Sequence, residues 1–103
     1  GEAFSLIVGD VSFISLTLTL PPLVPLLQPG GHLLHLVKPQ FEVGRAGIGR
    51  GGLVKDPALY ADVEKRMRAL VSELGLCCTG WLHSPIAGGD GNREFFILAR
   101  KHL

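Results

Sequence analysis

The 103 residues of this chain suffice for one domain at most, with a hydrophobic core of modest size. Apolar residues make up 47% of the sequence and charged residues 18%, which excludes an intrinsically disordered chain. The formal net charge of +1 does not by itself indicate a nucleic-acid partner, so any basic surface has to be local. Residues 11–29 are uncharged, but their prolines, serines and threonines argue against a membrane-spanning helix. Because the chain lacks an initial Met and enters an apolar run almost at once, we expect it to be part of a longer protein.

The first half of the chain predicts two buried strands with a helix between them. Residues 4–10 and 32–38 are short apolar runs without polar alternation, which is typical of buried parallel strands. Between these runs, Pro21 and Pro22 suit the first turn of a helix, and the Pro-Gly-Gly sequence at 29–31 predicts its end. The start of this helix stays open, because residues 17–20 could also form a strand.

The second half predicts one amphipathic helix and two further strands. Asp56 is a candidate N-cap and Gly75 ends the helix, whose apolar stripe comprises Leu59, Val63, Met67, Leu70 and Leu74. Asp62 with Arg66, and Glu64 with Arg68, have the spacing of ion pairs on its solvent side. Strands at 76–83 and 93–101 enclose a turn-rich loop. The order predicts an α/β fold of about four strands and two helices, a mostly parallel sheet that ends in an antiparallel hairpin.

The cysteines and histidines indicate neither a disulfide nor a metal site. Cys77 and Cys78 are adjacent, and neighbouring strand residues point to opposite faces, so we interpret them as core thiols in a reducing compartment. The four histidines, His83 near the cysteines included, lack the spacing of metal ligands. Trp81 and Phe95 could stack on bases, but packing in a small core explains them more simply.

Three charged residues are predicted to meet at one edge of the sheet. Parallel sheets place their sites beyond the carboxyl ends of the strands. Asp10 ends the first strand and Lys38 the second, while Glu94 lies at the start of the fourth, which runs the opposite way. A lysine between carboxylates is either a structural ion pair or a site of proton transfer, and the residues alone leave both interpretations open.

Five ordered motifs resemble the TlyA, or haemolysin A, family of FtsJ-like S-adenosylmethionine-dependent RNA methyltransferases. They are DVSFISL at 10–16, LLQPGG at 26–31, VKPQFEVGR at 37–45, GGLVKDP at 51–57 and GNREFF at 91–96. The resemblance spans nearly the whole chain. It implies that residues 1–103 are the carboxyl-terminal half of a Rossmann-like methyltransferase domain. The upstream cofactor half and an S4-like RNA-binding domain of the family have no counterpart in this sequence.

The resemblance also implies a reaction and its residues. The family transfers a methyl group from S-adenosylmethionine to a ribose 2′-hydroxyl of ribosomal RNA with a Lys-Asp-Lys-Glu tetrad. Asp10, Lys38 and Glu94 match its last three members, and the first lysine has no match here. Lys38 would accept or steer the hydroxyl proton, and the two carboxylates would orient it.

For the cofactor, the resemblance implies a wall formed by Asp10, Val11, Ser12 and Phe13. Ordinary packing of a strand-to-helix turn explains Ser12 and Phe13 equally well. We expect the 103 residues alone to be inactive and the longer protein to be cytoplasmic, with ribosomal RNA or a ribosomal subunit as partner and no membrane. A non-catalytic RNA-binding or assembly fragment of the same fold is the alternative. Residues 4–10 would leave an open sheet edge, so a homodimer through that edge is also expected.

A glycine-rich segment follows Lys38. Gly47, Gly49 and Gly52 match the G-x-G-x-x-G fingerprint of dinucleotide-binding loops. That loop must connect a strand directly to a helix, yet Gly47 lies nine residues past Lys38 and the helix begins only after Asp56. The context therefore disfavours a dinucleotide site. The basic residues of this segment instead favour contact with RNA phosphates; they are Arg45, Arg50 and Lys55. The alternative is a solvent-exposed loop whose charges only keep it soluble.

Overall fold

A computed structural model describes residues 3–9, 15–44, 47–49, 54, 56–84 and 93–103. Its strands are β1 (Phe4–Gly9), β2 (Leu27–Val37), β3 (Leu76–His83) and β4 (Phe95–Lys101). Its α-helices are α1 (Leu16–Leu23) and α2 (Ala58–Glu73), and two short 3₁₀ helices are η1 (Val24–Leu26) and η2 (Pro39–Phe41). This order of elements agrees with the order that the sequence predicts.

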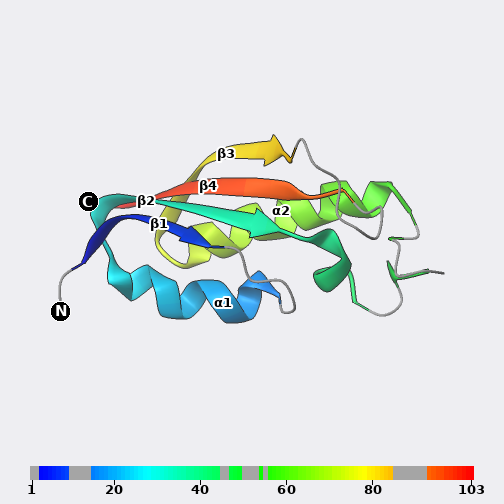
Figure 1. The fold of residues 1–103 in the computed structure, drawn as a ribbon, viewed down its shortest axis with the longest axis horizontal. Helices are drawn as coiled ribbons and strands as arrows, with labels where there is room; N and C mark the ends of the chain where they lie inside the picture. Colours follow the sequence, from blue (N-terminus) through cyan, green and yellow to red (C-terminus); the bar gives the residue numbers. More distant parts are fainter. Residues whose placement is uncertain (1–2, 10–14, 45–46, 50–53, 55, 85–92) are drawn as a thin grey trace.

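The described strands form one mixed sheet in the order β1-β2-β4-β3 (Figure 1). β1 pairs with β2 in parallel, whereas β4 is antiparallel to both β2 and β3. β1, β2 and β3 thus share one direction, and the predicted mostly parallel sheet with a final antiparallel hairpin is confirmed. The sequence did not predict that β4 enters the sheet between β2 and β3.

Both α-helices cover the same face of the sheet. Alternate residues of β2 and β4 lie opposite one another on that face, Leu33 with Ala99 and Val37 with Phe95. All four are buried in one cluster with residues of both helices: Leu16, Leu20, Val63, Met67 and Val71. The other face has no helix of the described chain on it, and it exposes apolar side chains of the strands, Leu6, Val8 and Leu82 among them.

Helix α1 begins earlier than the prolines suggest. The Ser15 hydroxyl accepts a hydrogen bond from the Thr17 amide and caps the helix at its first turn. Pro21 and Pro22 therefore lie near the end of α1 and not in its first turn. Their missing N–H groups remove two hydrogen bonds of the last turn, after which the chain tightens into η1.

Strand β2 also begins earlier than expected, because Pro29, Gly30 and Gly31 belong to it. Phe4 pairs with Leu27 and Leu6 with His32, so β2 accommodates its extra residues in a bulge between these two pairs. Gly30 has φ +78°, a conformation that favours glycine. The prediction that Pro-Gly-Gly at 29–31 ends a helix is therefore wrong, because these residues form a bulge near the start of β2.

Helix α2 forms where it was predicted, except that its N-cap is Pro57 and not Asp56, and that one of its two predicted ion pairs is not formed. The Asp56 carboxylate accepts the Ala58 amide at 2.9 Å, and Gly75, with φ +82°, follows the last turn. Glu64 and Arg68 form the predicted ion pair at 2.9 Å. The prediction of an ion pair between Asp62 and Arg66 is wrong, because the Arg66 guanidinium donates to the backbone carbonyl of Glu42 instead, at 2.7 Å.

The cysteines are both free, as their adjacency predicts. Cys78 packs against the hydrophobic core, whereas Cys77 is exposed on the other face. The interpretation of Cys77 as a core thiol is therefore wrong. Alternation along β3 is the cause, since only one of two neighbouring residues can face α2.

Candidate functional site

The strand ends that the sequence singled out meet at one edge of the sheet. β1 ends at Gly9, which is paired with His35, and β2 ends two residues further on at Val37. Val37 lies opposite Phe95, the first residue of β4. Lys38 and Glu94 are the next residues on either strand, so this register sets them opposite each other. Asp10 follows Gly9 directly but lies outside the described residues.

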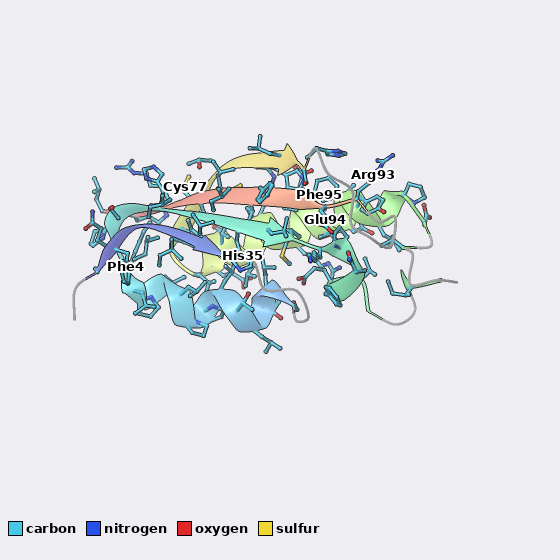
Figure 2. All side chains as sticks on the ribbon, viewed as in Figure 1. Phe4, His35, Cys77, Arg93, Glu94 and Phe95 are labelled. Atoms are coloured by element: carbon cyan, nitrogen blue, oxygen red, sulfur yellow. The ribbon has the colours of Figure 1, made fainter. Side chains whose placement is uncertain are left out.

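Local hydrogen bonds fix the backbone at Lys38 and Glu94. The Lys38 carbonyl accepts the Phe41 amide at 3.0 Å and opens η2, while the Glu94 carbonyl accepts the Ser84 amide at 2.8 Å and closes the hairpin. Both side chains are half-buried. Within the described ranges no ion pair joins them, so Lys38 is not held by Glu94 in a direct salt bridge. Figure 2 labels Arg93, Glu94 and Phe95 at the start of β4.

A buried histidine fixes the end of β1. His35 is 0% exposed, and its Nδ1 donates to the Leu36 carbonyl at 2.7 Å. Its ring lies against Gly9 so closely that a Cβ at Gly9 would come within 3.0 Å of the ring atoms Cδ2 and Nε2. Nε2 has no hydrogen-bond partner among the described residues. Packing of Gly9 on His35 therefore fixes the point from which the chain continues into Asp10.

A buried carboxylate fixes the start of α1. Glu42 is 8% exposed, and it accepts the Leu16 amide at 2.9 Å and the Ser15 hydroxyl at 2.6 Å. A carboxylate at a helix N-terminus satisfies unpaired amides and also interacts favourably with the helix dipole. The Arg66 guanidinium of α2 donates to the backbone carbonyl of Glu42. Glu42, which lies in the segment after Lys38, therefore connects α2 to the first turn of α1. Sequence reasoning missed it, because its partners lie 26 and 27 residues away.

The glycine-rich segment has a different role from the fingerprint that it resembles. Gly44 has φ +73° and its carbonyl accepts the Gly47 amide at 3.1 Å. A Cβ on Gly47 would lie 2.8 Å from Val43, so close packing requires glycine there. An isolated antiparallel bridge joins Ile48 to Val54, and α2 begins only at Ala58. The strand-to-helix context of a dinucleotide loop is therefore missing, as the spacing predicted.

The remaining predicted site residues lie outside the described residues. For the proposed cofactor wall they are Asp10, Val11, Ser12 and Phe13. For the proposed RNA contacts they are Arg45, Arg50 and Lys55. The described structure fixes their neighbours: Gly9 and Ser15 flank the first set, and the Ile48–Val54 bridge lies within the second.

Sequence relatives of the chain include ribosomal RNA methyltransferases. A family model described as FtsJ-like methyltransferase matches residues 1–101. YqxC of Bacillus subtilis, which is provisionally named an rRNA methyltransferase, is 54% identical over 88 residues, 85% of this chain and 31% of YqxC. The 16S/23S rRNA (cytidine-2′-O)-methyltransferase TlyA of Mycobacterium tuberculosis is 42% identical over 100 residues, 97% of this chain and 37% of TlyA. The chain thus spans about a third of the length of these curated relatives.

Solved structures agree with this relationship. A hemolysin-like protein from Streptococcus thermophilus superposes with a TM-score of 0.92 at 42% identity, over 98% of this chain and 36% of that one. The N-methyltransferase NodS of Bradyrhizobium japonicum shares the fold at a TM-score of 0.59 and 17% identity, over 100% of this chain and 53% of its own. None of the helices in the described ranges has the length and apolar character that a membrane crossing requires. By sequence and by fold, the chain belongs to the FtsJ-like methyltransferase family, with a Rossmann-like α/β architecture.

Proposed function

We propose that the protein to which this chain belongs transfers a methyl group from S-adenosylmethionine to a ribose 2′-hydroxyl of ribosomal RNA. The observation that carries the proposal is the register of β2 and β4 in a chain of the FtsJ-like family: Val37 pairs with Phe95, so Lys38 and Glu94 follow at neighbouring strand ends. The name of the relative TlyA, a cytidine-2′-O-methyltransferase, supports the ribose hydroxyl as the acceptor. Such an enzyme acts in the cytoplasm on a ribosomal subunit or on its RNA.

In this proposal, the reacting hydroxyl lies at the edge formed by the carboxyl ends of β1 and β2. The Lys38 side chain accepts or steers its proton, and Asp10 and Glu94 orient the lysine and balance its charge. Positioning of this kind turns an encounter in solution into an oriented reaction between neighbours. Proton transfer by a positioned side chain adds about 10²–10⁴-fold to the rate.

The described residues fit part of a cofactor site. The segment 10–14 runs between two fixed points, Gly9 on the His35 ring and Ser15 on the Glu42 carboxylate. Flanking residues that are held in place suit a wall against which a small molecule packs. We assign contact with S-adenosylmethionine to Asp10, Val11, Ser12 and Phe13. When bound, S-adenosylmethionine supplies the methyl group.

The glycine-rich segment is assigned to RNA binding. Arg45, Arg50 and Lys55 flank or interrupt its glycines in the sequence, and basic side chains suit contact with phosphates. Residues 1–103 then form a partial methyltransferase domain, and the rest of the cofactor site and an S4-like RNA-binding domain belong to other parts of the longer protein. We therefore expect the 103-residue chain alone to lack activity.

The direct test is methyl transfer by the full-length protein. Ribosomal RNA is incubated with the enzyme and methyl-labelled S-adenosylmethionine and then hydrolysed with alkali. Because a 2′-O-methyl group blocks cleavage of the adjacent phosphodiester, the label should appear in alkali-resistant dinucleotides. Label in mononucleotides would assign the reaction to the bases. RNA binding without any label would support the non-catalytic alternative.

The open edge of the sheet gives a second expectation, self-association of the 103-residue chain. Among the described strands β1 is paired only with β2, and Phe4, Leu6 and Val8 are all more than half exposed. An unpaired apolar edge strand tends to pair with another copy. Sedimentation velocity over a range of concentrations should therefore reveal a homodimer.

A pair of matched variants tests whether that edge is responsible. Val8→Lys places a charge on β1, and Leu18→Lys places one on α1; both positions are 64% exposed. Val8→Lys should shift the chain toward the monomer, while Leu18→Lys should leave the dimer intact. A chain that stays monomeric at all concentrations, or a dimer that both variants weaken equally, contradicts the edge model.

A further inference from the structure

Ring-bearing side chains surround a hollow at the end of the sheet where β3 ends and β4 begins. The hollow has a volume of about 280 Å³ and lies between the first turns of α2, the end of β3 and the start of β4. Its lining includes Tyr60, Trp81, His83, Arg93 and Phe95. Arg93 and Phe95 are the two neighbours of Glu94 in the chain, so the hollow lies at the same end of β4 as Glu94. Figure 2 labels these three residues at that end.

The rings are arranged around Phe95, which is 3% exposed. Trp81 stacks on it with 5.1 Å between ring centroids and 25° between planes, and His83 meets it edge-on at 4.6 Å. Tyr60 is tilted against it at 5.8 Å. Phe95 is thus a core residue, as the sequence predicted, but Trp81 and Tyr60 are only half-buried and His83 is exposed. Three rings therefore present surface to solvent around one hollow.

The charge of this hollow favours an anionic ligand. The exposed Arg93 guanidinium lies 5.5 Å from the Tyr60 ring centroid, and no carboxylate within the described ranges pairs with it. Glu64, the acidic residue of the lining, is paired with Arg68 at 2.9 Å. The Glu64 carboxylate is thereby neutralised by Arg68, whereas the Arg93 guanidinium is paired with no carboxylate of the described residues and lies over the Tyr60 ring.

We propose that this hollow binds one unpaired nucleobase of the RNA substrate, in contact with Tyr60, Trp81 and His83, while Arg93 donates to the adjoining phosphate. Aromatic side chains stack on bases of any sequence, and recognition of single-stranded RNA depends on such stacking together with basic groups. The volume suits one base and not a longer segment. The proposal rests on the proposed function only in taking RNA as the substrate, and it requires no methyl transfer.

Trp81 allows a direct measurement, because it is the one tryptophan of the chain. The 103-residue chain is titrated with an unstructured hexacytidylate RNA and, separately, with an abasic RNA of the same length and charge. The hexacytidylate should quench Trp81 fluorescence saturably, and the abasic RNA should bind at least about tenfold more weakly, the size expected for one stacked base. Equal quenching by both RNAs, or none by either, overturns the proposal.

Variants separate this hollow from basic surface elsewhere. Arg93→Ala and His83→Ala remove exposed side chains, so far-UV circular dichroism should remain unchanged, and each should weaken hexacytidylate binding about tenfold. Arg100→Ala is the matched control, since Arg100 is an exposed arginine at the opposite end of β4. If Arg100→Ala loses as much affinity for hexacytidylate as Arg93→Ala does, the proposal is contradicted. It is also contradicted if an acidic peptide quenches Trp81 fluorescence as strongly as hexacytidylate does.

Measurements on the full-length protein distinguish this proposal from the proposed function. If Arg93→Ala weakens RNA binding while labelled methyl groups still enter ribosomal RNA at saturating substrate, both proposals stand. Unchanged KM and kcat in Arg93→Ala and His83→Ala would overturn the stacking site and leave the methyltransferase assignment untouched. Base-dependent quenching of Trp81 in a protein that transfers no methyl group would support the stacking site and overturn the methyltransferase assignment.

Discussion

Replacing Lys38 with alanine in the full-length protein is expected to abolish methyl transfer to ribosomal RNA and to leave the fold intact. The structural contact of Lys38 within the described chain is made by its backbone carbonyl, which the substitution retains. The side chain is half-buried and outside the hydrophobic cluster, so its loss removes little packing. If Lys38 carries the proton-transfer step, kcat should fall by about 10²–10⁴-fold. Labelled methyl incorporation measures the first effect and thermal unfolding the second.

Two further variants give this experiment its controls. Lys65→Ala removes an exposed lysine from α2, and it should retain wild-type kcat. Glu94→Gln keeps the size of the side chain opposite Lys38 but removes its charge, so kcat should fall less than in Lys38→Ala. Wild-type turnover by a folded Lys38→Ala enzyme removes Lys38 from the reaction. Equal losses of kcat in Lys38→Ala and Lys65→Ala would indicate that the assay responds only to the positive charge that attracts RNA.

The predictions that succeeded depend on residues close together in sequence. The stripe Val63–Met67–Leu70 and the turn at Gly75 define α2 locally, and short apolar runs define the strands. The edge that carries Lys38 and Glu94 follows from one further rule, that parallel strands end on the same side. Register then brings the two residues opposite each other, since Val37 pairs with Phe95.

The predictions that failed concern partners far apart in the chain. Arg66 prefers the Glu42 carbonyl, 24 residues away, to the neighbouring Asp62. Glu42 caps α1 across 26 residues, and no local pattern signals such a cap. The Pro-Gly-Gly sequence at 29–31 is compatible with a helix end and with a strand bulge, and only pairing with β1 decides between them.

Replacing Gly9 with alanine is expected to destabilise the fold by about 1–3 kcal/mol, the usual cost of overpacking a well-packed site. The new methyl group would come within 3.0 Å of the His35 ring. That ring is fully buried and its Nδ1 donates to the Leu36 carbonyl, so a shift of the ring away from the methyl group would disturb both its packing and this hydrogen bond. The free energy of unfolding, measured by urea denaturation of the 103-residue chain, tests this. Gly80→Ala in β3 is the control, because its Cβ would meet nothing closer than 3.6 Å.

A double-mutant cycle identifies the histidine as the cause. His35→Ala removes the ring that the methyl group would strike, although it also destabilises the chain by leaving a cavity. If the clash is the origin of the effect, Gly9→Ala should cost much less in the His35→Ala background than in the wild type. Additive losses would mean that His35 does not impose glycine at this position. The packing of Gly9 on the His35 ring would then not be what fixes the end of β1 before Asp10, and the anchor that we assign to the proposed cofactor wall would have to lie elsewhere.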